Sequence, residues 1–361
     1  MRAAVCRAFG APLRIESVSL APPGPLQVAV RIEACAVCHS DVAYAAGAWG
    51  GPLPAVYGHE AAGRVSAVGA GIRGYAAGDR VLVTLIRACG GCPACAGGQP
   101  TSCAHAWDPG PSPLRAADGT ELAQGMATGA FAEAVVVDPS QLAPLPDDLP
   151  ADLACLLACG VITGVGAVVN TARVPPGATV AVVGAGGVGL NAIQGAAIAG
   201  AGRIVAVDTR AAQLDVARRF GATDGVLAGP EAGATLRRLT DGRGLDFVFV
   251  SVGSPAAIGE AAGWLAAGGA LVVVGLPPSG SVAGYDPTTL AAMNQRILGS
   301  RMGQAVLARD IPWLIDAWRA GRLKLAELIA GRFRLDEVNA AMDATRAGSA
   351  GRNVIVFGDA G

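Results

Sequence analysis

One stretch of the sequence limits the fold more than any other: an apolar run, a glycine-rich turn and a helical segment follow one another directly. Residues 179–183 predict a buried strand, and the run G-A-G-G-V-G at 184–189 matches G-x-G-x-x-G. The first glycine permits a tight turn, the second lets a pyrophosphate approach the backbone, and the third allows close helix–strand packing. The phosphates would lie at a helix N-terminus, where free N–H groups favour anions. The expected dinucleotide contacts are Gly184, Gly186, Gly187, Val188 and Gly189.

A carboxylate at the end of the next predicted strand indicates which dinucleotide is bound. Asp208 follows Gly189 by 19 residues and ends the apolar run 204–208. An acid at this place accepts a hydrogen bond from the adenosine ribose 2′-hydroxyl and repels a 2′-phosphate. Asp208 therefore predicts NAD rather than NADP. The alternative, a glycine-rich turn without a coenzyme, does not explain why strand, helix and acid occur together.

Two different patterns divide the chain near residue 150. Before this point, short β-branched runs separated by glycine and proline predict antiparallel sheet, and the patternless residues 88–130 predict loops. After it, strands alternate with helices, which is typical of a doubly wound parallel sheet. The predicted antiparallel strands are 28–32, 63–68, 80–83 and 131–137. The predicted parallel strands are 179–183, 204–208, 247–250 and 271–274. The fold class is therefore α/β.

Composition excludes several classes of protein. The chain has 361 residues, 15% of them charged, and a formal net charge of -1, which argues against a disordered chain and against a nucleic-acid partner. The uncharged stretches 153–172 and 174–202 are long enough to cross a membrane, but glycine and polar residues interrupt them, so we expect buried core instead. The N-terminus shows no signal-peptide pattern, and we expect a cytoplasmic protein.

Four of the nine cysteines fall in one short segment. They follow the pattern C-x2-C-x2-C-x7-C from residue 89 to residue 103. Four thiolates close the tetrahedral shell of a structural zinc ion and leave no position for water. An iron–sulfur cluster is the competing interpretation, because four cysteines also hold one. The predicted ligands are Cys89, Cys92, Cys95 and Cys103.

A second set of metal-ligand residue types is dispersed along the chain. Cys38, His59 and Cys159 would give zinc three protein ligands and leave one position open, as in catalytic zinc sites. Spacing alone supports this set weakly, because buried cysteines are usually inert.

These motifs together resemble the zinc-dependent medium-chain alcohol dehydrogenases over nearly the whole chain. The matching segments are C-H-S-D at 38–41, G-H-E-A-A-G at 58–63, the four-cysteine loop, C-G-V-I-T-G at 159–164, the glycine turn, Asp208, and G-R-N at 351–353. The chain is most similar to the class III-like branch, which includes thiol-dependent formaldehyde dehydrogenases. Residues 118–122 and 128–133 are most similar to its mycothiol-dependent members.

The resemblance implies a GroES-like, β-rich catalytic domain with two zinc sites and a Rossmann domain for NAD. The expected boundaries are 1–155 with 299–361 for the first and 156–298 for the second. The family implies catalytic zinc on Cys38, His59 and Cys159, and structural zinc on the four-cysteine loop. Asp41 would hydrogen-bond His59, and Glu60 would lie behind the metal. His39 and Arg352 would contact the pyrophosphate, with Thr163 and Leu276 near the nicotinamide.

The resemblance also implies a reaction. Zinc lowers the pKa of an alcohol, a hydride passes reversibly between alcohol and NAD(H), and Ser40 accepts the alcohol proton. Two residues depart from the family pattern. Ala43 stands where many members carry the histidine that ends the proton relay, so the relay must finish on water or another group. Gln213 stands where many members have a lysine, and without that lysine we expect weaker binding of NAD.

The substrate is less narrowly defined by the resemblance. Trp49 stands where members that act on the glutathione adduct of formaldehyde carry an acid, and with Leu85 it would line an apolar pocket. We therefore expect a primary or aromatic alcohol or aldehyde, with mycothiol-dependent formaldehyde oxidation as the alternative. A zinc-free quinone or enoyl reductase would not need the three ligands, and a non-catalytic NAD-binding protein would not need Ser40 and Asp41. The expected partners are a small-molecule substrate and a second copy of the chain, as a homodimer or homotetramer.

Overall fold

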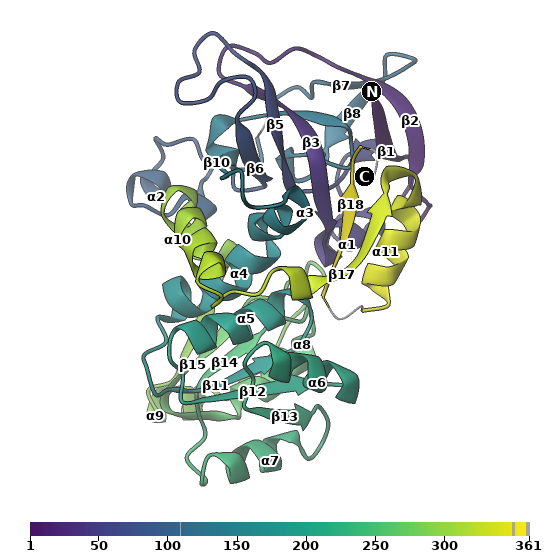
Figure 1. Cartoon of the computed structure of the whole chain (residues 1–361). Helices are drawn as coiled ribbons and strands as arrows, with labels where there is room; N and C mark the ends of the chain where they lie inside the picture. The colour runs from purple at the N-terminus through teal and green to yellow at the C-terminus, as the bar shows by residue number, and fades with distance from the viewer. Residues whose placement is uncertain (109, 349–350, 359–361) are drawn as a thin grey trace. The chain divides into compact units, whose positions relative to one another are not determined.

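The computed structural model describes residues 1–108, 110–348 and 351–358, and these divide into two compact units (Figure 1). Unit 1 contains Met1–Gly160, Val306–Leu314 and Leu325–Gly361, and unit 2 contains Val161–Ala305 and Ile315–Lys324. The two units meet at residues 160 and 305, where the sequence predicts 155 and 298. The segment Ile315–Lys324, expected in the first domain, belongs to unit 2. Each unit is described by itself below.

A five-stranded closed barrel forms one part of unit 1. Its strand order is β1-β2-β7-β8-β4, and the pairing of β1 with β4 closes it. The strands are β1 (Arg2–Cys6), β2 (Arg14–Leu20), β4 (Ala55–Val56), β7 (Leu114–Ala116) and β8 (Glu121–Gln124). The prediction of loops for 88–130 is wrong for β7 and β8. These strands are only three and four residues long, too short for an alternating pattern to stand out.

A seven-stranded sheet forms the other part of unit 1. Its order is β10-β6-β5-β3-β18-β17, with β9 also paired to β3. The strands are β3 (Val28–Val37), β5 (Glu60–Val68), β6 (Arg80–Thr84), β9 (Ala134–Val137), β10 (Leu142–Pro144), β17 (Ile329–Arg334) and β18 (Arg352–Val356). Asn353 of β18 lies opposite Val37 of β3. The C-terminal end of the chain is therefore part of the same sheet as the N-terminal region.

Unit 2 is a doubly wound α/β domain, as expected. All neighbouring strands of its six-stranded sheet run parallel, in the order β13-β12-β11-β14-β15-β16. Numbered along the chain this is 3-2-1-4-5-6, the order of dinucleotide-binding domains, whose switch point lies between β11 and β14. The strands are β11 (Thr179–Val183), β12 (Arg203–Asp208), β13 (Asp224–Leu227), β14 (Leu245–Val250), β15 (Leu265–Val273) and β16 (Arg296–Gly299). The connecting helices are α5 (Gly187–Ile198), α6 (Ala211–Arg219), α7 (Ala232–Leu239), α8 (Pro255–Ala262) and α9 (Pro287–Ala292).

The other helices range from 4 to 13 residues in length. They are α1 (His39–Ala45), α2 (Pro93–Ala96), α3 (Ala151–Ala154), α4 (Gly160–Gly166), α10 (Leu307–Arg319) and α11 (Val338–Arg346). The helical segment over residues 151–172 is interrupted at Cys159, whose φ of -145° is not helical. In the described part of the chain, no single helix is long and apolar enough to cross a membrane; only the bent pair Ala151–Ala158 and Gly160–Ala172 reaches that length when joined.

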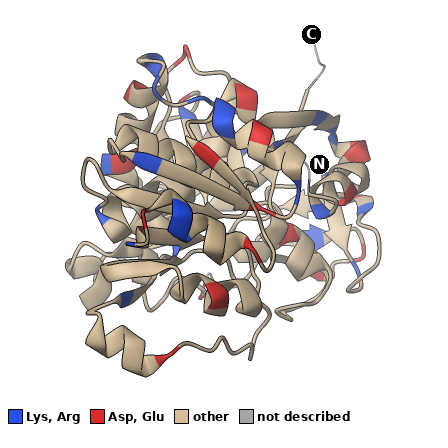
Figure 2. Ribbon diagram, turned by 90° about the horizontal axis from the view of Figure 1, so that it is seen from below, with Lys and Arg blue, Asp and Glu red and all other residues tan. Residues whose placement is uncertain are grey.

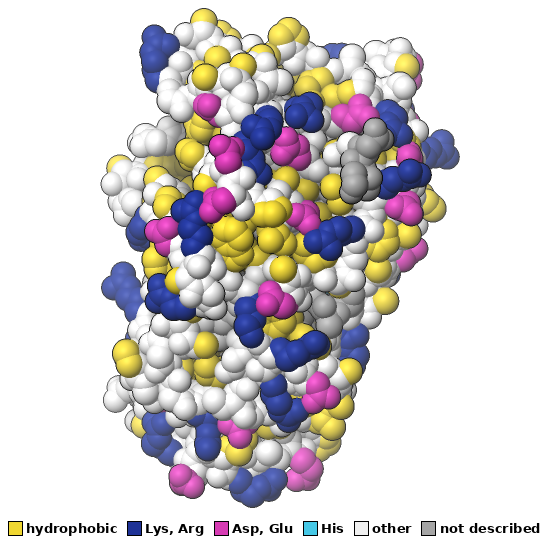
Figure 3. Space-filling model, viewed as in Figure 1, with side chains coloured by type: hydrophobic (Ala, Val, Ile, Leu, Met, Phe, Trp, Pro, Cys, Tyr) yellow, Lys and Arg dark blue, Asp and Glu magenta, His cyan; other side chains and the backbone are white. Residues whose placement is uncertain are grey.

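Charged residues of both signs are interspersed along the ribbon and on the face seen in the space-filling view (Figures 2 and 3). Many are paired with one another. Arg2 contacts Glu133 and Asp336, and Arg243 contacts Asp246. Exposed pairs of this kind contribute little to stability, on the order of 1 kcal/mol or less each. They do not form a field of one sign on the viewed faces.

Candidate functional site

Four ligand-type side chains that are distant in sequence meet inside unit 1. The ligand atoms of Cys38, His59, Glu60 and Cys159 all lie within 4.8 Å of one another, and all four residues are buried. Cys38 is the N-cap residue of α1, His59 and Glu60 lie at the start of β5, and Cys159 follows the turn Cys155–Ala158. The hydroxyl of Thr84 on β6 donates to the carbonyl of Ala158 at 2.6 Å and fixes that turn beside the sheet.

Asp41 contacts two members of this cluster and holds them in position. Its Oδ2 accepts the backbone N–H of Cys38 at 2.9 Å, and its Oδ1 accepts that of Gly58 at 2.9 Å. His59 Nδ1 lies 3.1 Å from the same Oδ1. With the carboxylate as acceptor, Nδ1 carries the proton and Nε2 keeps its lone pair. Asp41 thereby orients one ligand through its ring and another through its backbone.

One buried ring nitrogen of the cluster has no hydrogen-bond partner in the described part of the chain, as is expected of a metal ligand. Among the described residues, His59 Nε2 is one of three buried side-chain polar atoms without a hydrogen-bond partner. Such atoms are rare in folded proteins, and an ion is one accepted reason for them. Two thiols and an imidazole nitrogen are also the donor types that zinc prefers. The side chains present therefore fit a zinc ion.

Electrostatics in the cluster favour a thiolate. A hydrogen bond from Cys159, with the nearby positive charge of Arg352, holds the pKa of Cys38 well below its ordinary value although burial opposes this. Burial raises the pKa of Glu60 to about 7, against the opposing effect of Arg352. A thiolate is the form in which cysteine binds a metal.

Glu60 and Arg352 form a buried ion pair beside the cluster. The Arg352 guanidinium, from β18, donates to Glu60 Oε1. A Cβ at Gly160 would lie 2.6 Å from one guanidinium nitrogen, so a side chain there would displace the Arg352 guanidinium. The sequence did not indicate this role of Gly160, because it depends on a strand that pairs from the other end of the chain. The predicted pyrophosphate contact of Arg352 stays a prediction.

The four-cysteine segment also forms one cluster. The sulfur atoms of Cys89, Cys92, Cys95 and Cys103 lie within 4.8 Å of one another. Backbone N–H groups of Cys89 and His105 point at Cys103 Sγ, at 3.3 and 3.4 Å. These hydrogen bonds, with those from Cys89 and Cys95, lower the pKa of Cys103 although burial opposes this. The donor set fits a zinc ion. The segment that carries it, residues 88–108, has a small apolar core centred on Cys92, Cys103 and Ala106.

The glycine turn of unit 2 has the shape that a phosphate needs. Gly184 has a φ of +90°, where L side chains are strained, and a Cβ at Gly189 would lie 1.7 Å from the carbonyl oxygen of Gly184. At Gly186, the N-cap of α5, a Cβ would meet no atom within 4 Å. The turn is therefore closed on its protein side and open at Gly186, with helix N–H groups beside the opening.

The other predicted residues lie as follows. His39 is exposed and Ser40 half-buried in the first turn of α1. Trp49 is half-buried and packs edge-on against Tyr44 at 5.0 Å, and Leu85 is buried. The sequence did not indicate that Tyr44 also stacks on Tyr57 at 6.0 Å. In unit 2, Thr163 is buried with its hydroxyl 3.6 Å from Met302 Sδ, and Leu276 is exposed.

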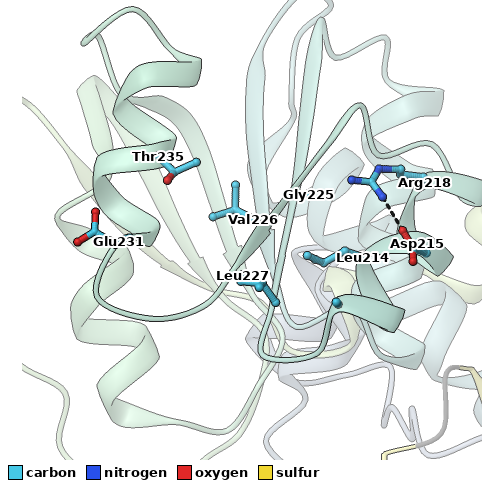
Figure 4. A pocket seen from close by; sticks show the side chains of 9 residues that line it. Leu214, Asp215, Arg218, Gly225, Val226, Leu227, Glu231 and Thr235 are labelled. Atoms are coloured by element: carbon cyan, nitrogen blue, oxygen red, sulfur yellow. Dashed lines mark hydrogen bonds and ion pairs between the residues drawn. The ribbon is translucent and has the colours of Figure 1, made fainter.

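A cavity of about 470 Å³ lies elsewhere in unit 2 (Figure 4). It opens between α6 and α7 over β13, with Leu214, Val226 and Leu227 as apolar lining and the Asp215–Arg218 ion pair at its side. None of the residues predicted to bind metal, coenzyme or substrate lines it. The cavity is therefore separate from the predicted site.

Comparisons with known proteins agree on one family. Residues 24–147 match the model of the alcohol dehydrogenase GroES-like domain, and residues 187–319 match that of the zinc-binding dehydrogenases. An alcohol dehydrogenase class-3 of Myxine glutinosa is 34% identical, over 98% of this chain and 97% of its own.

Two solved structures are also similar to this chain. An alcohol dehydrogenase zinc-binding domain protein from Burkholderia ambifaria has a TM-score of 0.94 at 34% identity, covering 99% of this chain and 98% of its own. Benzyl alcohol dehydrogenase from Acinetobacter calcoaceticus has a TM-score of 0.93 at 29% identity, covering 99% of both chains.

Proposed function

The chain belongs to the zinc-dependent alcohol dehydrogenase family of oxidoreductases, and on this premise we propose that it oxidises primary or aromatic alcohols reversibly with NAD. The observation that carries the proposal is the buried cluster of Cys38, His59 and Cys159, with His59 Nε2 left without a protein partner. A non-catalytic protein would have no use for such a costly arrangement of buried polar groups. Unit 1 would be the catalytic domain and unit 2 the coenzyme domain.

We propose two zinc ions per chain. Cys38, His59 and Cys159 would hold one, and Cys89, Cys92, Cys95 and Cys103 the other. When bound, the first supplies a Lewis acid that favours ionisation of an alcohol hydroxyl, while NAD supplies the hydride acceptor. Asp41 keeps the ring of His59 oriented. The Glu60–Arg352 ion pair lies beside the proposed ligands, and both of its residues are buried.

The residues of unit 2 would bind and select the coenzyme. The turn at 184–189 presents free N–H groups at the start of α5, which suits a pyrophosphate. Asp208 ends β12 beside this turn and would accept the ribose hydroxyl. Thr163 and Leu276 remain the residues proposed for the nicotinamide side.

Ser40 would take the proton released by the alcohol. Its hydroxyl lies in the first turn of α1, two residues after the ligand Cys38, and it is half-buried. A hydroxyl both accepts and donates, so Ser40 Oγ can pass a proton outward. Ala43 offers no group to continue the relay, so the proton would leave to water.

Trp49 favours an apolar or aromatic substrate. Its ring is held edge-on by Tyr44, which itself stacks on Tyr57, so three aromatic rings support one another beside α1. Rigid aromatic surface suits a benzylic substrate better than a charged thiol adduct.

Thiol-dependent formaldehyde oxidation is the second candidate, favoured by the class-3 relatives. The segment 118–122 that resembles mycothiol-dependent members forms the turn between β7 and β8 and the start of β8, where Asp118 accepts the N–H of Thr120. In the second such segment, Phe131 is fully buried. A local turn accounts for the first segment, and core packing accounts for Phe131 in the second.

We further propose a homodimer formed through β16. This strand pairs only with β15, so its other edge is open in the described structure. Ile297 on β16 is exposed, as are the apolar side chains of Val282, Tyr285 and Met293 in the preceding segment. An open apolar sheet edge is a template for pairing with another chain.

The test of the proposed activity is NADH formation from NAD with a panel of primary and benzylic alcohols, and with formaldehyde in the presence and absence of mycothiol. We expect turnover of benzylic alcohols without the thiol. Strict dependence on mycothiol would replace the first candidate by the second. An absence of NADH formation with every substrate would contradict both.

A further inference from the structure

Arg210 lies beside the carboxylate that is proposed to bind the coenzyme ribose. It is the N-cap residue of α6 and follows Asp208 by two positions. Its backbone N–H donates to Asp208 Oδ1 at 3.0 Å, and its Nε lies 4.0 Å from the same oxygen. Its side chain is about half exposed. A cation therefore stands at the carboxyl end of β12, where dinucleotide-binding sheets receive the adenosine half of the coenzyme.

Asp208 is held firmly in this position. Its second oxygen, Oδ2, accepts the backbone N–H of Ala185 in the glycine turn at 2.8 Å. Each carboxylate oxygen thus has its own backbone donor, one from the turn and one from the start of α6. Because the carboxylate cannot easily turn away, a group at the ribose 2′ position would meet Asp208 and Arg210 together.

The two charges have opposite effects on a 2′-phosphate. A carboxylate repels it, whereas a guanidinium binds phosphate with paired hydrogen bonds. Gln213, which stands where many members of the family have a lysine, is buried and uncharged, so it supplies no positive charge at this place. Arg210 is the cation that the structure places against Asp208.

We propose that Arg210 determines coenzyme selectivity: its guanidinium offsets the repulsion by Asp208, so the enzyme binds NADP as well as NAD, with NAD preferred. This inference rests on the proposed function, because it concerns the same coenzyme site. The expectation drawn from Asp208 alone is a preference for NAD, because its carboxylate repels a 2′-phosphate; Arg210 would reduce that preference. The chemistry recognised is a ribose 2′-phosphate monoester.

The experiment is calorimetric titration of the zinc-containing protein with NADH and with NADPH. We expect the wild type to bind both, NADH more tightly. Arg210→Gln should weaken NADPH binding at least about tenfold, the effect of losing a charge-assisted hydrogen bond. NADH binding should change by less than about threefold, because an exposed ion pair contributes little. Arg210→Lys should retain most of the NADPH affinity.

Arg218→Gln is the matched control. Arg218 is an equally exposed arginine two turns further along α6, paired with Asp215 and away from Asp208. It should leave both affinities unchanged. The inference is overturned if the wild type binds NADH but not NADPH, or if Arg210→Gln weakens both coenzymes equally or neither. A wild type that binds neither coenzyme would overturn the proposed use of NAD as well, so the two failures are distinguishable.

Discussion

The carboxylate of Asp41 is buried, and both of its oxygens accept hydrogen bonds from the protein. It accepts two backbone N–H groups and faces His59 Nδ1, so its charge is compensated without contact with water. The same contacts position Cys38 and His59, two of the proposed zinc ligands. The neighbouring Glu60–Arg352 ion pair depends on Gly160, because the lack of a side chain at that position leaves room for the Arg352 guanidinium. A change of one carboxylate oxygen at Asp41, or the addition of one carbon at Gly160, should therefore disturb the cluster.

Asp41→Asn should weaken zinc binding in the buried cluster about 10- to 100-fold, because an amide cannot hold the ring and both N–H groups as a carboxylate does. The measurement is zinc retained per chain during titration with a chelator. Asp118→Asn, which changes an exposed turn, is the control and should retain both ions. Equal retention by Asp41→Asn and the wild type would show that Asp41 does not support the metal.

Gly160→Ala should lower the free energy of unfolding by about 2 kcal/mol, since the added Cβ would overlap the Arg352 guanidinium in a packed interior. Urea denaturation measures this change. Gly284→Ala is the control, because a Cβ at that exposed position meets no atom within 4 Å. If both variants unfold at the same urea concentration, the pair tolerates more space than the structure indicates.

The elements differ in how well the sequence predicts them. β11, α5 and β12 lie where the apolar runs and glycine turn predict them, because burial on both faces gives a continuous signal. β17 was not predicted, since its six residues alternate between half-buried and exposed and include two arginines. The Cys38, His59 and Cys159 set was weak by spacing alone, because strand pairing and not sequence distance brings these residues together. The family resemblance supplied what spacing could not.

The four-cysteine segment, residues 88–108, is the part of the chain that we expect to depend most on the proposed second zinc ion. Cys103→Ser should release one zinc ion and speed proteolysis within residues 88–108, because the small apolar cluster there cannot hold the segment alone. Limited proteolysis followed by mass spectrometry measures the cleavage sites. Cys6→Ala, at a buried cysteine outside both clusters, should not increase cleavage there. Unchanged cleavage in Cys103→Ser would contradict a stabilising metal in this segment.

At the scale of the molecule, the two ends of the chain build one unit and the middle builds the other. The pairing of β18 with β3 joins residues more than 300 positions apart, and this pairing also delivers Arg352 to Glu60. The sheet of unit 2 has two different edges. β16 carries exposed Ile297 at one end, while β13 carries exposed Leu227 at the other.

Ile297→Glu should convert the proposed dimer into a monomer, because two carboxylates would face each other across the joined edges. Sedimentation velocity measures the change. Leu227→Glu, which introduces the same charge on the opposite edge of the sheet, should remain dimeric. A wild type that sediments as a monomer, or a dimer that survives Ile297→Glu, would contradict assembly through β16.

Elemental analysis of zinc tests the central claim most directly. The account predicts two zinc ions per chain in the wild type and one in Cys38→Ser, which should lose turnover and still bind NADH. Cys35→Ala, at a buried cysteine outside both clusters, should keep both ions. One ion or none in the wild type, or two ions in Cys38→Ser, would contradict the account.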